Sequence, residues 1–521
     1  MRVALRTDAS GRIGTGHLRR CLSLARALNA EGVDTLFICR RHDALSAAIE
    51  SEGQAHAWLP KPPPCFVARP DDPPHADWAG VAWEQDARET ARALAGFAPD
   101  WVLVDHYALD ARWHGALSAA TSARIAAIDD LGDRPLAVDL LIDQNLQPDG
   151  SGKYEGRLPA AARTLLGPRH ALLAGIYAQA PRYRFRRHVA SIGIFMGGAD
   201  LDDFGGRVLR ACREVAGFEG SIELVSSRRS PHFAAHEELA RRWPGTRVLA
   251  GLPDLADFFA RHDLQVGAGG GAAWERCCLG APTLALQIAA NQGAVLPQLA
   301  ARGAVEWLQR PDPGVEAIGR AVRRLLDEPR RRLALVRASR CLVDGRGSAR
   351  VAAVLALAGG MPWQFRAAEA TDEELLLAWA NEPQARAQAF DPSTITPAGH
   401  HAWFRQRLAR ADDCLIVIAC SRAGTPVGQV RFDRTGEAWS IDYALDSAHR
   451  GWGHGRRLLA GAIGFFRGRR GFAELKALVK ADNAASLGVF RGLGFAESAA
   501  VHQGQPCREF RSSTTAMMEP R

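Results

Sequence analysis

Short apolar runs that alternate with helical segments constrain the fold of the first two-thirds of the chain. The first series predicts strands at residues 3–6, 35–39, 101–105, 124–128 and 140–143. A second series predicts strands at residues 191–196, 221–225, 247–249, 264–266 and 283–287. Strands that alternate with helices form parallel sheets covered on both faces, so each series predicts one Rossmann-like α/β half. Ligands of such sheets bind beyond the carboxyl ends of the strands.

The most informative of these strand ends lies in the run from Arg6 to Cys21, RTDASGRIGTGHLRRC. The run leaves the first strand, passes through a loop with Gly14 and Gly16, and enters a helix. Backbone N–H groups at a helix start bind phosphate, and His17 stands at this helix mouth. The run therefore suggests chemistry on a phosphorylated substrate. Asp8, in the same loop, could orient His17, bind a substrate hydroxyl, or serve only as a turn residue.

The second series carries glycine at the same position of its strands. Gly197 and Gly198 follow the strand at 191–196, and a later glycine run ends with Gly270 and Gly271 before a helix. One such junction alone is most simply a tight turn, but three facing one cleft favour a phosphate-bearing ligand. Glu275, one turn into the later helix, could accept hydrogen bonds from ribose hydroxyls or only stabilise the helix N-terminus.

The length of 521 residues is too great for one core, and the pattern changes after residues 356–362. Helices predicted at 371–381 and 400–408, with strands at 415–419, 427–432, 439–445 and 476–479, indicate a separate α+β domain. The predicted domains are residues 1–180, 188–355 and 362–515.

Composition restricts the classes of partner. The net charge of +8 is mild for this length, and the basic runs at 182–187 and 330–332 are short. They favour solvated faces over a nucleic-acid patch. The ten cysteines show no metal-ligand spacing, which is typical of reduced thiols. No apolar run reaches the roughly 20 residues of a membrane span, and the first residues enter a strand directly. The sequence thus predicts a cytoplasmic protein without a metal, a nucleic-acid partner or a membrane partner.

Several motifs occur in order over about residues 1–350: RTDASGRIGTGHLRRCLSLA, VLVDHY, LLGPRHALL, GGAD, GAGGGAAWE, APTLAL, AANQ and LVDGRG. Together they resemble the UDP-sugar hydrolase of pseudaminic-acid biosynthesis. The resemblance implies a pair of Rossmann-like domains of the GT-B type. It also implies inverting hydrolysis of UDP-2,4-diacetamido-2,4,6-trideoxy-β-L-altrose to UDP and free sugar. It makes His17 the catalytic base and places Tyr107 and Asn291 in the active site.

This chemistry fits the residues independently. UDP is a good leaving group, so no carboxylic acid is needed to protonate it, in contrast to a glycosidase. Backbone N–H groups can stabilise the departing diphosphate, and one base must activate water on the opposite face of the sugar. A neutral histidine suits that role, although His17 could instead contact phosphate or cap the helix.

The C-terminal domain resembles the GCN5-related N-acetyltransferases (GNAT). The run RGWGHG from Arg450 to Gly455 follows a strand and opens a helix, and NAASLGVFRGLGF begins at Asn483. The resemblance implies that this turn clasps the pyrophosphate of acetyl-CoA. It predicts an acetyl-CoA site formed by Leu445, Arg450, Gly451, Gly453, Gly455 and Asn483. A glycine-rich turn before an ordinary helix is the alternative.

One position departs from the acetyltransferase pattern. Many members have tyrosine where this chain has Phe490, and that hydroxyl is proposed to protonate the leaving thiolate. Phenylalanine has no hydroxyl, so the thiolate leaves unassisted or another group serves. The base that deprotonates the amine is open, with His401, Glu382 and Asp442 as candidates.

The fusion predicts a bifunctional enzyme, because the two domains match consecutive steps of the pseudaminic-acid route. The C-terminal domain would acetylate the 4-amino group of a UDP-amino sugar, and the N-terminal halves would then remove UDP. Three alternatives remain: a GT-B glycosyltransferase with a sugar acceptor, an acetyltransferase domain that acts on another amine, and an RNA-binding or regulatory module driven by basic charge.

Overall fold

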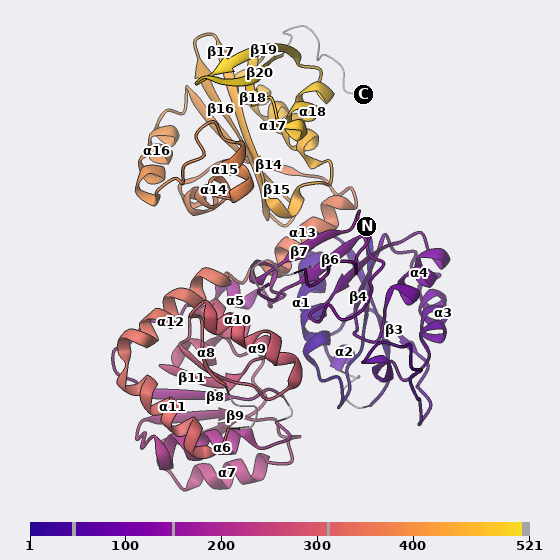
Figure 1. Ribbon diagram of the computed structural model, residues 1–521, viewed down its shortest axis with the longest axis vertical. Helices are drawn as coiled ribbons and strands as arrows, with labels where there is room; N and C mark the ends of the chain where they lie inside the picture. The colour runs from indigo at the N-terminus through magenta and orange to yellow at the C-terminus, as the bar shows by residue number, and fades with distance from the viewer. Residues whose placement is uncertain (44–47, 148–151, 199, 310–312, 513–521) are drawn as a thin grey trace. The chain divides into compact units, whose positions relative to one another are not determined.

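The computed structural model (Figure 1) describes residues 1–43, 48–147, 152–198, 200–309 and 313–512. The side chains of residues 48, 290 and 291 lie outside this description. The chain divides into two compact units, Met1–Ala352 and Ala353–Arg521. Each unit is described by itself.

The first unit contains two parallel sheets. The N-terminal sheet has the order β3-β2-β1-β4-β5-β6-β7. Its strands are β1 Arg2–Thr7, β2 Asp34–Arg40, β3 His56–Leu59, β4 Trp101–Asp105, β5 Arg124–Ile128, β6 Leu140–Asp143 and β7 Arg163–Leu166. The helices of this half are α1 Gly16–Ala30, α2 Ala48–Ser51, α3 Trp83–Leu94, α4 Ala111–Ala120 and α5 Ile176–Gln179, with short 3₁₀ turns η1 Ala76–Trp78 and η2 Pro168–His170.

The second sheet repeats the arrangement in the order β10-β9-β8-β11-β12-β13. Its strands are β8 Ser191–Phe195, β9 Ser221–Val225, β10 Thr246–Leu249, β11 Leu264–Ala268, β12 Thr283–Leu286 and β13 Glu306–Leu308. Its helices are α6 Phe204–Arg210, the π-helical turn η3 Ala211–Val215, α7 Phe233–Arg241, α8 Ala256–Arg261, α9 Gly271–Leu279, η4 Ala290–Ala294, α10 Leu296–Ala301, α11 Val315–Asp327 and α12 Pro329–Leu342. Both orders reverse direction beside the first strand of the sheet, which is the Rossmann pattern that creates a ligand crevice.

Every strand predicted for these two halves is present, with ends that shift by one or two residues. The sequence did not predict β3, β7 and β13, which are all edge strands. Their side chains are mostly half-buried or exposed, in contrast to the fully buried β4. An edge strand lacks the continuous apolar run that identifies a central parallel strand.

The second unit contains one mixed sheet in the order β14-β15-β16-β17-β18-β20-β19. The strands are β14 Gln364–Ala367, β15 Cys414–Cys420, β16 Pro426–Thr435, β17 Ala438–Leu445, β18 Leu475–Lys480, β19 Ala496–His502 and β20 Gln505–Arg511. The helices are α13 Gly347–Ala358, η5 Ala370–Asp372, α14 Glu373–Ala380, α15 Pro383–Gln388, α16 Pro397–Ala409, η6 Ser447–His449, α17 His454–Arg470 and α18 Ala484–Gly492. Helix α13 begins in the first unit and ends in the second.

Strands β17 and β18 pair in parallel for only a short distance. Their register holds at Trp439↔Leu475 and Ser440↔Lys476, although β17 continues to Leu445. The two strands therefore separate toward the carboxyl end of β17.

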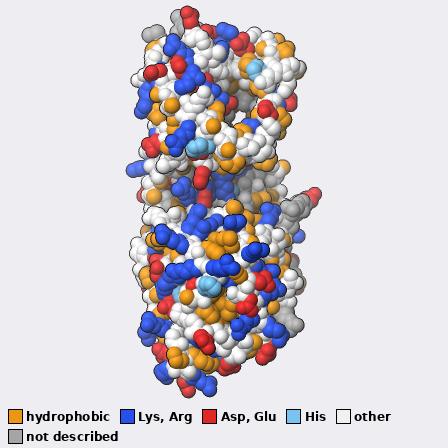
Figure 2. Space-filling model, turned by 90° about the vertical axis from the view of Figure 1, so that its left-hand side faces the viewer, with side chains coloured by type: hydrophobic (Ala, Val, Ile, Leu, Met, Phe, Trp, Pro, Cys, Tyr) orange, Lys and Arg blue, Asp and Glu red, His pale blue; other side chains and the backbone are white. Residues whose placement is uncertain are grey.

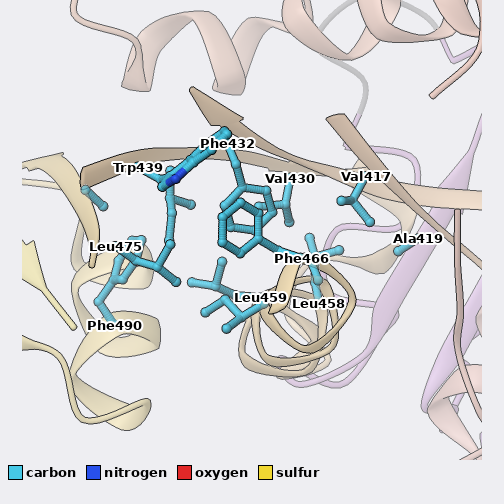
Figure 3. Close-up of a cluster of buried hydrophobic side chains, with 14 of the residues drawn as sticks. Val417, Ala419, Val430, Phe432, Trp439, Leu458, Leu459, Phe466, Leu475 and Phe490 are labelled. Carbon is cyan, nitrogen blue, oxygen red and sulfur yellow. The ribbon is translucent and has the colours of Figure 1, made fainter. Parts of the chain in front are cut away.

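An apolar core lies between the second unit's sheet and helix α17 (Figure 3). The rings of Phe432 and Phe466 stack with centroids 4.6 Å apart, and Trp439 meets Phe466 edge-on. Leu458 and Leu459 on α17 are completely buried against this cluster. Two parallel Rossmann-like sheets followed by a mixed α+β sheet confirm the predicted fold class.

The cysteines of the chain are free thiols. Eight of them are buried, whereas Cys65 and Cys341 are exposed. Among the described residues, no helix has both the length and the apolar character needed to cross a membrane.

The predicted basic runs lie among carboxylates and backbone acceptors. In the run at 330–332, Arg331 pairs with Glu306 at 2.5 Å, and the buried Arg332 donates to backbone oxygens. Arg186, in the run at 182–187, lies 3.3 Å from Asp263. Figure 2 shows one face of the molecule, on which Lys and Arg side chains are mixed with acidic and apolar ones.

Candidate active sites

The first candidate site surrounds His17, in the first turn of α1. Parallel strands β1 and β4 are neighbours with Thr7 opposite Asp105, so the end of β4 lies beside the start of this helix. His17 Nδ1 donates to Asp105 Oδ1 at 2.6 Å. A carboxylate only accepts hydrogen bonds, so Nδ1 carries the proton and Nε2 is the nitrogen with a free lone pair.

Asp105 is completely buried and is held by a second cation. Arg20, one turn after His17, donates to both of its carboxylate oxygens at 2.6 Å. Although burial opposes ionisation, Arg20 and then His17 hold the pKa of Asp105 well below its ordinary value. Asp105 therefore remains a carboxylate that fixes the orientation of the His17 ring.

Tyr107 lies on the other side of His17, with ring centroids 4.6 Å apart and nearly perpendicular planes. Its hydroxyl donates to Asp130 Oδ2 at 2.5 Å, and Arg20 contacts the same oxygen. Burial, followed by the charge of Asp130, raises the pKa of Tyr107 well above its ordinary value. Tyr107 is therefore a hydrogen-bond donor held beside His17, and the structure brings together the predicted pair His17 and Tyr107.

Asp8 lies in a different network. Its carboxylate pairs with the buried guanidinium of Arg6 at 2.6 Å and lies 3.1 Å from His106 Nε2. Of the roles that the sequence left open for Asp8, the orientation of His17 falls to Asp105 instead, whereas the carboxylate of Asp8 is held by Arg6. The sequence analysis missed Asp105, although it stands in the VDHY run beside Tyr107.

The proline-rich segment between β3 and α3 supplies a second missed group. Its turn η1 places the Trp78 ring 6.0 Å from His17 and 5.5 Å from Tyr107. His75 packs against Trp78 at 4.7 Å. These aromatic rings form a wall beside the histidine. Periodicity could not reveal this, because the segment has no regular structure apart from η1.

Five of the six predicted glycines of the first unit lie at open positions. A β-carbon would meet no heavy atom within 4 Å at Gly14, Gly16, Gly197, Gly198 and Gly271. Gly14 and Gly197 have φ angles of 76° and 96°, which other residues rarely adopt. The N-cap residues Thr15 of α1 and Gly270 of α9 make no side-chain cap. Both helix starts therefore present first-turn N–H groups at the carboxyl end of a sheet.

Glu275 lies on α9 and accepts a hydrogen bond from Tyr177. Burial raises the pKa of Glu275 above its ordinary value. Its predicted contact with ribose stays a prediction.

Asn291 lies in η4, and its side chain is outside the described part of the structure. The neighbouring Gln292 accepts from the N–H of Gly269 at 3.3 Å and so ties η4 to the start of α9.

The second candidate site is a cavity of about 1290 Å³ in the second unit. It opens where β17 and β18 separate, and it is lined by all six residues predicted to bind acetyl-CoA: Leu445, Arg450, Gly451, Gly453, Gly455 and Asn483. Gly451 and Gly453 have φ angles of 77° and 75°, so the turn before α17 requires glycine at both positions.

Two of the predicted residues hold the walls of this cavity. Arg450 donates to the Leu445 carbonyl at 3.0 Å and pairs with Glu382 at 2.7 Å. Asn483 caps α18 by accepting from the N–H of Ser486 at 3.1 Å. These contacts hold the starts of α15 and α18, both of which line the cavity.

The three candidate bases differ in position. Glu382 caps α15 and pairs with Arg450, which occupies its carboxylate. His401 pairs with Glu373 at 2.8 Å outside the cavity lining. Asp442 lines the cavity from β17 with a largely exposed carboxylate, which Arg431 approaches only to 3.8 Å. The geometry therefore favours Asp442.

The described part of the chain contains no group of three or more His, Cys, Asp or Glu that could hold a metal ion.

Comparison with known proteins agrees with this division of the chain. The family described as the acetyltransferase (GNAT) domain matches residues 364–496. The spore coat polysaccharide biosynthesis protein SpsG of Bacillus subtilis (strain 168) is 28% identical over 195 residues, which are 36% of this chain and 57% of that protein. The chain thus spans a little over half the length of this curated relative.

Two solved structures are also similar. MurG of Acinetobacter baumannii covers 67% of this chain and 98% of its own at 12% identity, with a TM-score of 0.49. A spermidine N-acetyltransferase of Vibrio cholerae, solved with CoA and spermine, covers 29% of this chain and 94% of its own at 13% identity, with a TM-score of 0.27. Both scores are below 0.5, so the fold rests on the strand orders given above.

The C-terminal part of the chain carries an acetyltransferase domain of the GNAT type. The N-terminal part resembles a polysaccharide biosynthesis protein and has two Rossmann-like halves of the GT-B type.

Proposed function

We propose that the chain is a bifunctional enzyme of nucleotide-sugar metabolism. Its second unit acetylates the 4-amino group of a UDP-amino sugar with acetyl-CoA. Its first unit hydrolyses the product, UDP-2,4-diacetamido-2,4,6-trideoxy-β-L-altrose, to UDP and the free sugar with inversion. The observation that carries the hydrolase proposal is the His17–Asp105 hydrogen bond of 2.6 Å at the open start of α1.

In the hydrolase step, the first-turn N–H groups of α1 and α9 bind and stabilise the diphosphate. His17 Nε2 takes a proton from a water molecule, which attacks the anomeric carbon on the face opposite the diphosphate. Asp105 stabilises the imidazolium that forms, as a buried carboxylate does beside a histidine base. UDP leaves without protonation, and the attack from the opposite face inverts the anomeric centre.

In the transferase step, the turn at Gly451 and Gly453 and the start of α17 bind the pyrophosphate of acetyl-CoA. Asp442 faces the cavity and takes a proton from the attacking amine. The amine nitrogen then forms a bond to the acetyl carbon, the carbon–sulfur bond breaks, and coenzyme A leaves. Alignment of amine and thioester within the cavity supplies a large part of the rate.

The test uses purified full-length protein, acetyl-CoA and the UDP-linked 4-amino sugar, with coenzyme A and UDP measured together. We expect both products from the wild type. His17→Ala should release coenzyme A but no UDP, and Asp442→Asn should slow coenzyme A release. As a complement, Asp442→Asn given the diacetamido sugar directly should release UDP at the wild-type rate.

Each failure has a separate meaning. Release of UDP without coenzyme A would overturn the proposed transferase step. The second candidate function would then apply, in which the acetyltransferase domain acts on another amine. Phe490, which lacks the hydroxyl of the family pattern, favours this candidate. UDP release that requires a sugar acceptor would replace hydrolysis by glycosyl transfer. Coenzyme A release together with an unaffected His17→Ala variant would remove His17 from the hydrolase step.

A further inference from the structure

The departing sulfur in the second unit needs a proton source that sequence comparison does not provide. A free thiol titrates near pH ~8.5, so coenzyme A leaves as a thiol at neutral pH only if a proton reaches the sulfur. Position 490 is phenylalanine, and it is buried against Phe510 and Phe495. Residues 353–521 contain a single tyrosine, Tyr443 on β17.

Tyr443 lies directly beside Phe490. The two ring centroids are 6.0 Å apart, and both side chains line the cavity. The Tyr443 hydroxyl forms a hydrogen bond of 2.9 Å with Ser486 Oγ in the first turn of α18. Tyr443 and Ser486 are the hydroxyl-bearing side chains among the described residues of the cavity lining.

The position of Tyr443 on β17 is also suitable. It follows Ser440, the last residue of β17 that pairs with β18, so it lies where the two strands have separated. Leu445, two residues further, belongs to the predicted acetyl-CoA site. A thioester held between the separated strands and the turn before α17 would pass Tyr443.

Tyr443 and Asp442 face opposite sides of the sheet. Side chains alternate along a strand, and Tyr443 pairs with Val430, which is in the core against α17. Asp442 pairs with Arg431, whose guanidinium lies 5.2 Å from the Trp403 ring of α16. Both side chains line the cavity that opens between the separated strands, so Asp442 can take the amine proton from one side while Tyr443 gives a proton to the sulfur from the other.

We propose that Tyr443 is the general acid of the acetyl transfer. The bond between the amine nitrogen and the acetyl carbon forms, the carbon–sulfur bond breaks, and the phenolic proton passes to the sulfur. The phenolate regains a proton from water through Ser486, while the amine proton goes to Asp442. The products are the acetamide and coenzyme A with its thiol. This proposal depends on the acetyltransferase function proposed above.

The surroundings keep the donor protonated until it acts. Burial raises the pKa of Tyr443 above its ordinary value, partly offset by the Ser486 hydrogen bond. The phenol therefore carries its proton at neutral pH, as a general acid must.

The first test does not need the acetyl acceptor. Free coenzyme A is bound to the full-length protein, and its thiolate is titrated by ultraviolet absorbance. A hydroxyl donor beside the sulfur stabilises the thiolate, so Tyr443→Phe should move the thiol titration upward by about one pH unit. Tyr183→Phe, the matched control, removes a tyrosine hydroxyl from the first unit and should leave the titration unchanged. A thiol titration identical in the wild type and Tyr443→Phe overturns the proposal.

The second test is kinetic. With the UDP-amino sugar, Tyr443→Phe should lower kcat about 100-fold while the KM for acetyl-CoA stays the same. Phe490→Tyr in the Tyr443→Phe background should recover part of the loss, because it returns a phenol to the adjacent ring. A rise in the KM for acetyl-CoA with an unchanged kcat would show a packing role and contradict the proposal. If the wild type does not acetylate this sugar, the proposed function fails, and the thiol titration still decides the role of Tyr443.

Discussion

Asp105 accepts the Nδ1 hydrogen of His17 at 2.6 Å, although 88 positions separate the two residues in sequence. The bond depends on the parallel pairing of β1 and β4, which brings the two strand ends to one edge of the sheet. It selects the tautomer in which Nε2 can accept a proton. The hydrogen bond that one ring nitrogen donates decides which nitrogen of a histidine can accept a proton.

Asp105→Asn tests this relationship. The amide can donate to Nδ1, which would then favour the tautomer with the proton on Nε2 and remove the base. We expect kcat for UDP release to fall by about 100- to 1000-fold. Coenzyme A release by the same preparation is the internal control and should not change. Unaltered UDP release would mean that the hydrogen bond has no part in the reaction.

Trp78→Ala tests the aromatic wall. Trp78 packs on both His17 and Tyr107, so its removal exposes the base to water and loosens both rings. An aromatic contact of this kind contributes about 1 kcal/mol, which predicts a fall of about five- to tenfold in kcat/KM for UDP release. Trp58→Ala in the edge strand β3 is the matched control. Equal effects of the two substitutions would contradict a specific role.

Asp86→Asn tests the buried charges beneath the first site. Asp86 accepts from Arg6 at 2.7 Å, from Arg40 at 2.8 Å and from Trp113 at 3.0 Å. Loss of the carboxylate leaves two buried guanidinium groups without their shared partner, which should cost about 3–5 kcal/mol. Hydrogen exchange of β4 measures the loss, and the exposed Asp71→Asn should change it by less than about 0.5 kcal/mol.

The same carboxylate gives a pH dependence. Burial raises the pKa of Asp86, but Arg6 and Arg40 outweigh burial and lower it to about 2. A folded-state pKa below the unfolded one stabilises the fold at pH values above about 4, and this contribution disappears as the pH falls toward 2. Wild-type protection of β4 should therefore decline over this range, whereas Asp86→Asn should show a smaller decline. Parallel curves would place the titrating group elsewhere.

His454 predicts a second pH dependence, in the second unit. Burial, followed by the charge of Arg457, lowers the pKa of His454 to about 4. The unfolded chain binds a proton near pH ~6.5, so the stability of this unit should fall as the pH drops from there to about 4. A ring resonance of His454 that titrates below pH ~5 in NMR would confirm the shift; titration near pH ~6.5 would contradict it.

Gly453→Ala tests the turn before α17. Gly453 has a φ angle of 75°, which costs about 1–2 kcal/mol for a residue with a β-carbon. We expect the affinity for coenzyme A to fall about tenfold, measured by calorimetry. Gly464→Ala in the same helix is the control, since that glycine is exposed and has no heavy atom within 4 Å of the added carbon. Its affinity for coenzyme A should match the wild type.

The residues that sequence reasoning found and missed differ in one physical respect. The residues that were found, His17, Tyr107 and the glycine turns, stand at strand ends. The alternation of strands and helices along the chain predicts a parallel sheet, in which these ends lie at one edge. The sequence could not show that Arg6 pairs with Asp8 and that Asp105 contacts His17, because side-chain packing decides which carboxylate each group meets.

Trp78 and Tyr443 were missed for other reasons. Trp78 reaches the first site through a proline-rich segment whose path has no periodicity to read. Tyr443 reads as one apolar position of an alternating strand, and only the separation of β17 from β18 opens its ring to a cavity.

The difference in burial among the thiols allows the first unit to be labelled selectively with fluorescent dyes. Cys65 lies in the proline-rich segment that carries Trp78, and Cys341 lies on α12 in the other Rossmann-like half. Both are exposed, while the remaining eight are shielded. A maleimide dye pair would therefore label these two sites in the unaltered protein, and energy transfer between them would follow any movement of the halves when a nucleotide binds.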